Sequence, residues 1–203
     1  MDKIVESVLE TLLKSGFIVV EVSARHVHLS AGDLERLFGK GTVLTPKREL
    51  SQPGQYLSEQ RITVIGPKGR KERVAILGPV RSATQVELSL TDCAELGIKA
   101  PLRESGKVEG SGAVTLEGPA GSLQIPQGAI VAHNHLHLTP EDADMIGVTD
   151  GQHVSVEVVT ERPVVFKDVI VRVSENFRSR MHIDFDEANA AMVNGFTLGR
   201  IIK

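Results

Sequence analysis

An internal repeat is the feature of this sequence that most restricts its fold. The segment His26-Val27-His28-Leu29-Ser30-Ala31-Gly32-Asp33 is matched 109 residues later by His135-Leu136-His137-Leu138-Thr139-Pro140-Glu141-Asp142. Each segment follows an apolar run and leads from H-x-H-L into a Ser or Thr with an acid three residues on, which is typical of a capped helix start. Because the spacing is about half of the 203-residue chain, we interpret the chain as a duplicated β-barrel unit.

The remainder of the sequence predicts mainly β structure. Runs rich in Val and Ile, several of them alternating with polar residues, are separated by Gly and Pro turns. Strands are expected at 17–23, 61–65, 72–77, 84–89, 113–117, 129–133, 153–159, 163–173 and 181–185. Short helices are expected after Ser30, after Thr91, after Thr139 and over 186–193. The fold class is therefore mainly β, with two β-barrel units capped by short α-helices.

The domain organisation follows from the repeat and from the sequence pattern at the N-terminus. Residues 1–16 predict an amphipathic helix, because apolar residues recur there at helical spacing and Gly16 supplies a stop. This helix either docks on the body of the protein or serves as a targeting or partner-binding segment. A Gly- and Ser-containing stretch at 105–111 divides the repeats. We expect the helix at 1–16, a first barrel unit at 17–108 and a second at 109–203.

Composition excludes several classes of protein. A formal net charge of −3 gives no basic surface for nucleic acid. No stretch approaches the ~20 apolar residues of a membrane span, and the N-terminus lacks the pattern of a secretion signal. Cys93 is the single cysteine, which rules out an internal disulfide and a Cys-rich zinc site and indicates a reducing compartment. We therefore expect a cytoplasmic protein.

Histidine placement predicts a metal site. In a strand, residues i and i+2 point to the same face, so each H-x-H presents two imidazoles side by side, and neutral imidazole is a good ligand for zinc and related metals. A single H-x-H would be explained equally well by surface or core histidines. Two matched copies with a further histidine in an apolar strand favour a metal centre. Its candidate histidines are His26, His28, His135, His137 and His182, with His133 as a supporting or structural residue.

Two further residues are candidates for the same chemistry. Glu87 alternates with Val86 and Leu88, so it is either a carboxylate ligand or a solvent-exposed acid. Arg81 follows a Gly-Pro turn six residues earlier, and its planar guanidinium can bind phosphate through two hydrogen bonds. An isolated arginine of this kind also occurs simply on protein surfaces.

Four separated motifs, taken in order, resemble the PduL-type phosphate propanoyltransferases, the phosphotransacylases of propanediol and ethanolamine microcompartments. The resemblance runs from about Val20 to the C-terminus. The motifs are Val22-Ser23-Ala24-Arg25-His26-Val27-His28-Leu29, Leu77-Gly78-Pro79-Val80-Arg81-Ser82 with Thr84-Gln85-Val86-Glu87, His133-Asn134-His135-Leu136-His137, and Met181-His182-Ile183-Asp184 with Glu187-Ala188-Asn189-Ala190.

The resemblance implies a pair of β-barrels with a two-zinc site between them. It assigns metal binding to His26, His28, Glu87, His135, His137 and His182, with Glu87 bridging the two ions. It assigns phosphate to Arg81, and coenzyme A to Ser23, Ala24, Arg25 and Asn189. Lys68, in a basic turn, is a candidate for the nucleotide phosphates. The implied reaction is acyl-CoA plus phosphate to acyl phosphate plus CoA, with propanoyl-CoA as the expected substrate.

Other functions stay open at this point. A metal-dependent hydrolase could use the same cluster, and a metal-binding barrel module without catalysis would also carry it. The chemistry favours acyl transfer, because zinc stabilises a departing thiolate and a polarised carbonyl, whereas Cys93 has no assigned histidine to activate it as a nucleophile. The resemblance further implies residence in a bacterial microcompartment, with shell or cargo proteins as partners and self-association as an additional expectation.

Overall fold

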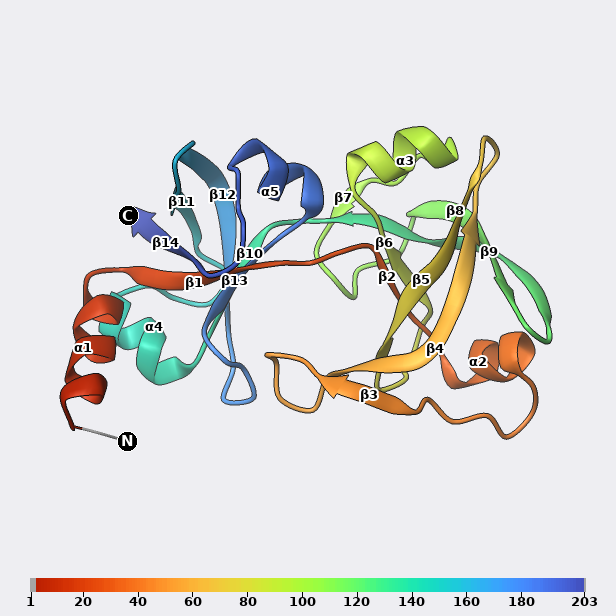
Figure 1. The fold of residues 1–203 in the computed structure, drawn as a ribbon, viewed down its shortest axis with the longest axis horizontal. Helices are drawn as coiled ribbons and strands as arrows, with labels where there is room; N and C mark the ends of the chain where they lie inside the picture. The colour runs from red at the N-terminus through yellow and green to blue at the C-terminus, as the bar shows by residue number, and fades with distance from the viewer. Residues whose placement is uncertain (1–2, 203) are drawn as a thin grey trace. The chain divides into compact units, whose positions relative to one another are not determined.

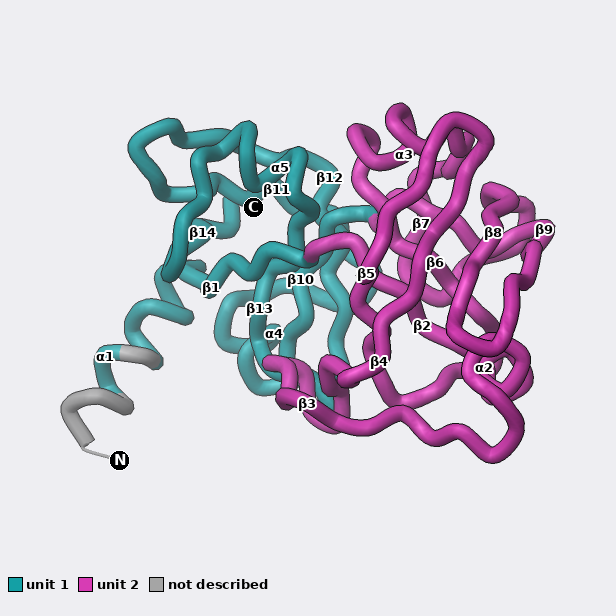
Figure 2. The backbone as a smooth tube through the Cα atoms, turned by 45° about the vertical axis from the view of Figure 1, so that its right-hand side comes forward, with its two compact units in different colours: residues 1–23, 133–203 teal, residues 24–132 magenta. Residues whose placement is uncertain are grey.

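The computed structural model describes residues 3–202, except for the side chains of residues 3–6 and 9. It is mainly β, which confirms the predicted fold class (Figure 1). The chain forms two compact units, which Figure 2 distinguishes by colour. Unit 1 consists of residues 1–23 and 133–203, and unit 2 consists of residues 24–132.

Unit 2 is built on a closed ring of six strands in the order β4-β5-β2-β6-β9-β8, with β8 returning to β4. Strand β3 adds to β4, and β7 adds to β9. The elements are β2 (His26–His28), α2 (Ala31–Phe38), β3 (Pro46–Glu49), β4 (Tyr56–Ile65), β5 (Arg70–Gly78), β6 (Gln85–Glu87), α3 (Leu90–Leu96), β7 (Leu102–Arg103), β8 (Gly112–Gly118) and β9 (Gly121–Ala132).

Unit 1 is a closed barrel in the order β1-β13-β10-β12-β11-β14. Its helix α1 packs beside α4 (Figure 1). The elements are α1 (Lys3–Lys14), β1 (Phe17–Val22), β10 (His135–Leu138), α4 (Pro140–Ile146), β11 (His153–Val159), β12 (Val164–Val173), β13 (Arg180–Ile183), α5 (Phe185–Ala190) and β14 (Thr197–Ile202).

The two barrels have the same pattern of strand pairing. The histidine strand pairs parallel with one neighbour and antiparallel with the other in both, as β5-β2-β6 in unit 2 and β12-β10-β13 in unit 1. The next pair round the ring is again parallel, β6 with β9 and β13 with β1, and the remaining pairs are antiparallel. The structure therefore contains the duplication that the sequence repeat predicts.

One strand of each repeat is exchanged. Strand β1 directly precedes β2 in the chain, but it pairs with β13 and β14 of unit 1, so that its red ribbon runs beside blue strands in Figure 1. Strand β9 directly precedes β10, but it pairs with β6 and β8 of unit 2. The division of the chain thus lies at 23/24 and 132/133 instead of the expected 108/109, and unit 1 is discontinuous.

Each unit has its own aliphatic core. Leu29 and Leu138 close the two H-x-H-L motifs, and each is fully buried in the core of its unit. Replacing a side chain of this kind by alanine costs about 2–5 kcal/mol. Cys93 is buried in the core of unit 2.

The predicted caps of the helices that follow the histidine strands are confirmed. The Ser30 hydroxyl accepts a hydrogen bond from the Asp33 backbone N–H, and the Thr139 hydroxyl accepts one from the Asp142 backbone N–H. These caps satisfy backbone donors at the first turn of α2 and α4. Each H-x-H strand is therefore followed by an anchored helix, which limits the conformations open to the histidines.

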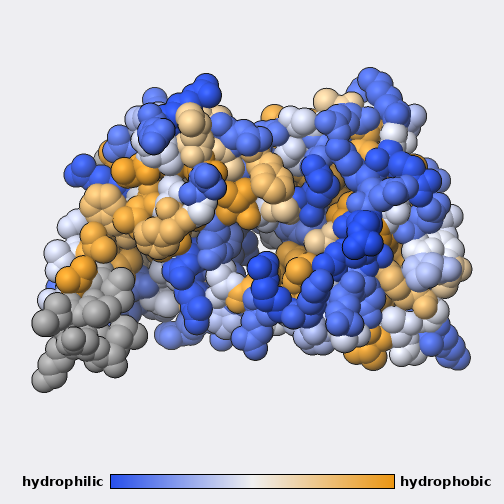
Figure 3. All heavy atoms as spheres, in the orientation of Figure 1, coloured by the Kyte–Doolittle hydropathy of each residue, from blue (hydrophilic) through white to orange (hydrophobic). Residues whose placement is uncertain are grey.

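The surface of unit 1 carries several exposed apolar side chains. Val159, Phe196 and Ile202 are examples, and Figure 3 shows apolar atoms gathered over the part of this unit where β11 and β14 run. Helix α1 is present over Lys3–Lys14, whereas the amphipathic character predicted for residues 1–16 depends partly on side chains outside the described set. Within residues 3–202, none of the helices combines the length and apolar character needed to cross a membrane.

Candidate functional site

Three of the predicted metal ligands meet in unit 2. Strands β2 and β6 place His26 directly opposite Glu87, and His28 lies two residues along β2 on the same face. One potential ligand atom from each of the three lies within 4.8 Å of the others. Glu87 is only 8% exposed, so the alternative that it is a solvent-facing acid does not hold.

Hydrogen bonds leave these side chains with nitrogen atoms available for a metal. His26 Nδ1 lies 2.8 Å from the Ala24 carbonyl oxygen, and because a carbonyl only accepts, the neutral ring carries its proton on Nδ1 and its lone pair on Nε2. That Nε2 lies 3.5 Å from Glu87 Oε2. His28 Nδ1 is buried and has no hydrogen-bond partner among the described residues. A buried polar atom of this kind fits a metal ligand.

The electrostatics of unit 2 keep His28 neutral and Glu87 charged. Burial, with the nearby charges of His26 and Arg81, lowers the pKa of His28 to about 3. Burial opposes ionisation of Glu87, but His26, His28 and the Ser105 hydroxyl outweigh it and lower the pKa of that carboxyl. The pKa of His26 is raised, because the charge and hydrogen bond of Glu87 outweigh burial. A metal ion would compete with a proton for His26 Nε2.

Unit 1 also brings the other predicted ligands together, but less closely, because among the described residues only the group of His26, His28 and Glu87 has ligand atoms all within 4.8 Å of one another. Strands β10 and β13 place His135 directly opposite His182, in the register that His26 and Glu87 have in unit 2. The rings of His135, His137 and His182 are mutual neighbours, with centroids 4.7–5.3 Å apart. In both units the third predicted ligand is thus the cross-strand partner of the first histidine.

The hydrogen bonding of the histidine pair also repeats in unit 1. His135 Nδ1 lies 2.8 Å from the His133 carbonyl oxygen, as His26 Nδ1 does from that of Ala24. His137 Nδ1 is buried without a partner among the described residues. Burial, with the charges of His135 and His182, lowers the pKa of His137 to about 2. This second cluster therefore also offers neutral imidazole nitrogen to a metal ion.

Arg81 is linked to the Glu87 cluster by a serine that the sequence did not single out. Arg81 Nη1 donates to the Ser105 hydroxyl at 3.1 Å, and that hydroxyl donates to Glu87 Oε1 at 2.9 Å. Gln85 Nε2 also donates to Glu87 Oε1, at 2.6 Å. Ser105 lies in the stretch taken to be a domain boundary, and only its hydroxyl could have hinted at this role. The predicted phosphate residue and the predicted carboxylate ligand thus share one hydrogen-bond network.

The candidate coenzyme A residues are divided between the units. Ser23 and Asn189 belong to unit 1, with Ser23 at the end of β1 and Asn189 exposed on α5. Ala24, Arg25 and Lys68 belong to unit 2. Lys68 is exposed in the turn between β4 and β5, whereas Arg25 Nε is bound to Asp92 at 2.8 Å.

His133, the predicted supporting residue, has contacts through both its backbone and its ring. Its carbonyl oxygen orients His135, and its Nε2 lies 3.3 Å from Asp168 Oδ2. The other Asp168 oxygen lies 2.6 Å from His153 Nδ1. Asp168 has φ +64°, an uncommon conformation for a residue other than glycine.

Comparison with known proteins adds a finding that is independent of the geometry. A family model described as phosphate propanoyltransferase matches residues 19–194. A relative named phosphate propanoyltransferase from Clostridioides difficile is 46% identical over 203 residues, which cover 100% of this chain and 97% of that protein. Relatives of the same name from Leptotrichia buccalis and Thermotoga maritima are 48% identical, covering 98% of this chain and 94% and 95% of those proteins. The similarity spans both histidine clusters.

Proposed function

Because the chain belongs to the phosphate propanoyltransferase family, and is therefore an acyltransferase, we propose that it moves a propanoyl group between coenzyme A and inorganic phosphate. We propose that each histidine cluster holds one zinc ion, giving two per chain. The ligands would be His26, His28 and Glu87 in unit 2, and His135, His137 and His182 in unit 1.

One observation carries the zinc proposal. In unit 2, ligand atoms of His26, His28 and Glu87 all lie within 4.8 Å of one another, whereas in unit 1 the rings of three histidines are neighbours. In each cluster one buried histidine nitrogen has no hydrogen-bond partner among the described residues. Burying a polar atom without a hydrogen-bond partner costs free energy of folding. Zinc accounts for it, because histidine and carboxylate are its usual ligands in sites that keep an open position.

The reaction exchanges one bond at the acyl carbon. A phosphate oxygen attacks the thioester carbonyl carbon, the C–S bond breaks, and coenzyme A leaves as a thiolate that takes up a proton. Zinc, when bound, supplies a Lewis acid that stabilises negative charge on oxygen or sulfur. Arg81 would bind the attacking phosphate through its guanidinium and hold it in place, and orientation alone can lower such a barrier by several kcal/mol. Ser105 would fix the guanidinium relative to Glu87.

Coenzyme A would be bound by the residues that match the family motifs, Ser23, Ala24, Arg25 and Asn189, with Lys68 on its phosphates. Ala24, Lys68 and Asn189 are exposed and Ser23 and Arg25 are half-buried, so each is open to a ligand to some degree. The thioester alone does not define the acyl chain, and propanoyl-CoA is proposed from the relatives' names.

The test is acyl transfer by purified protein with propanoyl-CoA, with metal analysis of the same preparation. We expect propanoyl phosphate to form in step with free thiol, a rate that saturates with phosphate, and about two zinc per chain. Thiol release that continues without phosphate would indicate a hydrolase. Zinc without either activity would indicate a binding module. Acetyl-CoA and butanoyl-CoA in parallel would define the preferred chain length.

We also propose that the enzyme works inside a bacterial microcompartment and that residues 1–16 take part in its encapsulation. A fluorescent protein carrying residues 1–16 should then enter shells when it is co-expressed with shell proteins. A fusion that stays outside, while the full-length enzyme enters, would assign the helix to the body of unit 1, where Leu13 packs against the core.

A further inference from the structure

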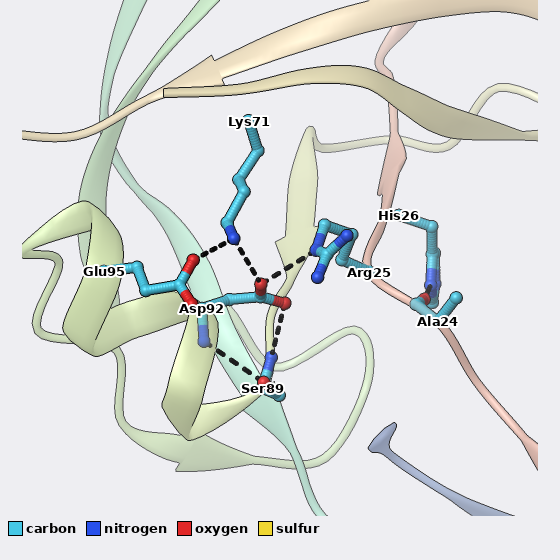
Figure 4. Close-up of polar contacts among 7 residues, drawn as sticks. All are labelled: Ala24, Arg25, His26, Lys71, Ser89, Asp92 and Glu95. Atoms are coloured by element: carbon cyan, nitrogen blue, oxygen red, sulfur yellow. Dashed lines mark hydrogen bonds and ion pairs between the residues drawn. The ribbon is translucent and has the colours of Figure 1, made fainter. Parts of the chain in front are cut away.

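A buried carboxylate lies behind the first ligand of unit 2. Asp92 is 1% exposed, and its Oδ1 accepts from Arg25 Nε at 2.8 Å and lies 3.5 Å from Lys71 Nζ. Figure 4 shows the Arg25 and Lys71 side chains converging on this carboxylate, with Ser89 on its other side. In the sequence, Arg25 lies between Ala24 and His26. The Ala24 carbonyl accepts the hydrogen bond from His26 Nδ1.

The same arrangement occurs in unit 1 with different residue types. Asn134 stands between His133, whose carbonyl binds His135 Nδ1, and His135 itself. Its Nδ2 donates to Glu187 Oε1 at 2.6 Å. Glu187 follows the third ligand, His182, by five residues, as Asp92 follows Glu87. Two chemically different pairs therefore occupy one structural position.

Both carboxylates also cap a helix, but capping uses only one of their two oxygens. Asp92 Oδ2 accepts from the Ser89 backbone N–H that begins α3, and Glu187 Oε2 accepts from the Asp184 backbone N–H that begins α5. A cap needs no burial, and burying a carboxylate costs more than a cap returns unless it is paired. The second oxygen of each is the one that binds the residue before the first ligand.

The charge around Asp92 argues against a simple anion site. Arg25 and Lys71 are matched by Asp92 and Glu95, and Lys71 also pairs with Glu95. The four side chains carry no net formal charge, so little attraction is left for a phosphate group. A closed and neutral network of this kind suits the fixing of backbone, and the backbone that it fixes carries the carbonyl that orients His26.

We propose that Asp92 and Glu187 are positioning residues for the two metal clusters. Each ties the segment before the first histidine to the helix that follows the third ligand, through Arg25 in unit 2 and through Asn134 in unit 1. The tie holds the carbonyl of Ala24 or His133 against Nδ1, so that Nε2 of His26 or His135 is presented to the metal. Partners of this type behind a ligand fix its tautomer and ring orientation. The inference rests on the proposed zinc sites but can be tested without them.

Four variants break the hydrogen bond between the carboxylate and its partner, two by changing the carboxylate and two by removing the donor. Asp92→Asn and Glu187→Gln keep a capping oxygen but turn an amide N–H₂ toward the donor of Arg25 or Asn134. Arg25→Met and Asn134→Leu remove the donor and leave the capping carboxylate in place. Ser89→Ala, which removes the capping hydroxyl of α3 alone, is the matched control for unit 2.

The first readout is the histidine tautomer in metal-free protein, measured by nitrogen-15 NMR. Asp92→Asn and Arg25→Met should lower the Nδ1–H population of His26 and leave that of His135 unchanged. Glu187→Gln and Asn134→Leu should do the reverse, so each unit is the control for the other. Ser89→Ala should lower the melting temperature and leave both tautomers unchanged.

The second readout is zinc affinity by chelator competition, with cobalt spectra of the substituted protein. Each of these four variants should lower the affinity for one of the two zinc ions by roughly 10–100-fold. Unchanged tautomers and affinities in both variants of a unit would overturn the proposal. So would a raised KM for acyl-CoA in Arg25→Met and Asp92→Asn with zinc affinity and tautomers unaffected, which would leave Arg25 only its proposed contact with coenzyme A. If the wild-type protein binds no zinc, the proposed function fails, while the tautomer measurement still decides the positioning role.

Discussion

His28 and His137 share one structural state, although they lie in different units and have different neighbours. In each, Nδ1 is buried and has no hydrogen-bond partner among the described residues, and the pKa is low, at about 3 and about 2. Each is thus a neutral ring with an unsatisfied nitrogen, next to a histidine whose Nδ1 is bound to a backbone carbonyl. This state occurs twice because the whole barrel occurs twice.

Zinc content should therefore fall one ion at a time. We expect His28→Ala and His137→Ala each to retain about one zinc per chain, and the double variant to retain none. Both single variants should stay folded by circular dichroism, because each unit has an aliphatic core of its own, and both should lose acyl transfer by several orders of magnitude. The exposed His153 gives the control His153→Ala. Loss of both ions from one substitution would mean that the clusters do not bind metal independently.

Acid should destabilise the metal-free protein in a defined window. The folded-state pKa values of His28 and His137 lie below the ordinary value of 6.5, so between those values the unfolded chain binds protons that the folded chain does not. The free energy of unfolding should then fall as the pH drops from about 6.5 toward 3, and it should be fully restored above 6.5. Urea titrations in the presence of chelator measure this slope.

The control for that slope is the double variant His28→Leu with His137→Leu. It should show a shallower pH dependence over the same window, because the two depressed pKa values are gone. His26, whose pKa is raised, acts in the opposite sense and is present in both proteins. An unchanged slope would mean that neither ring is held neutral by the fold.

The sequence could predict the duplication and the ligand candidates, because both are written in local patterns. The H-x-H spacing, the caps at Ser30 and Thr139 and the alternating strands each depend on a few neighbouring residues. Glu87 could be singled out but not placed, since alternation alone does not decide which face of a strand is buried. Its burial depends on its pairing with His26, which is 61 residues away in the sequence.

The exchange of β1 and β9 could not be predicted. Period-two alternation shows that a segment is a strand but not which strand it pairs with, and the stretch at 105–111 looks like a boundary because it is rich in Gly and Ser. Asp92 and Glu187 were missed for a different reason. An acid at the third position of a helix is fully explained by capping, and only the structure shows the second oxygen bound to Arg25 or Asn134.

Arg81 and Ser105 should have separable effects. Removing a charged hydrogen-bond donor costs about 1.5–3 kcal/mol, so Arg81→Ala should raise the KM for phosphate by roughly 10–100-fold with zinc retained. Arg81→Lys should recover only part of this, because an ammonium lacks the planar fork. Ser105→Ala should mainly lower kcat, since Arg81 keeps its charge and Glu87 keeps Gln85. Arg103, exposed on β7, gives the control Arg103→Ala; a raised phosphate KM there would point to general charge loss.

Asp168 combines backbone strain with two side-chain contacts. Its φ of +64° is tolerated best by Gly and next by Asn or Asp. We expect the order of stability to be wild type, Asp168→Asn, Asp168→Gly and then Asp168→Ala, since alanine loses both histidine contacts and keeps the strain. Melting temperatures measure this order. If alanine matched glycine, the positive φ would carry no cost, and only the contacts to His133 and His153 would count.

The exchanged strands predict which part of the chain can fold alone. Residues 24–132 contain every strand of the unit 2 ring as one continuous segment, so this fragment should fold cooperatively and bind one zinc. Residues 133–203 lack β1, which leaves the barrel open between β13 and β14, and this fragment should be unfolded or aggregated. An open edge of this kind exposes unpaired backbone groups to intermolecular pairing.

A rearranged chain tests the same point from the other side. Strands β14 and β1 are antiparallel, with Phe17 opposite Arg200 and the Gly16 carbonyl bonded to the Ile201 N–H, so the end of β14 lies beside the start of β1. A short Asn-Gly turn joining residue 203 to residue 16 would make a hairpin like the one that β8 and β9 form in unit 2. We expect the chain 133–203-turn-16–23 to fold and bind one zinc. If residues 133–203 folded equally well without β1, its pairing would not be required to close the barrel.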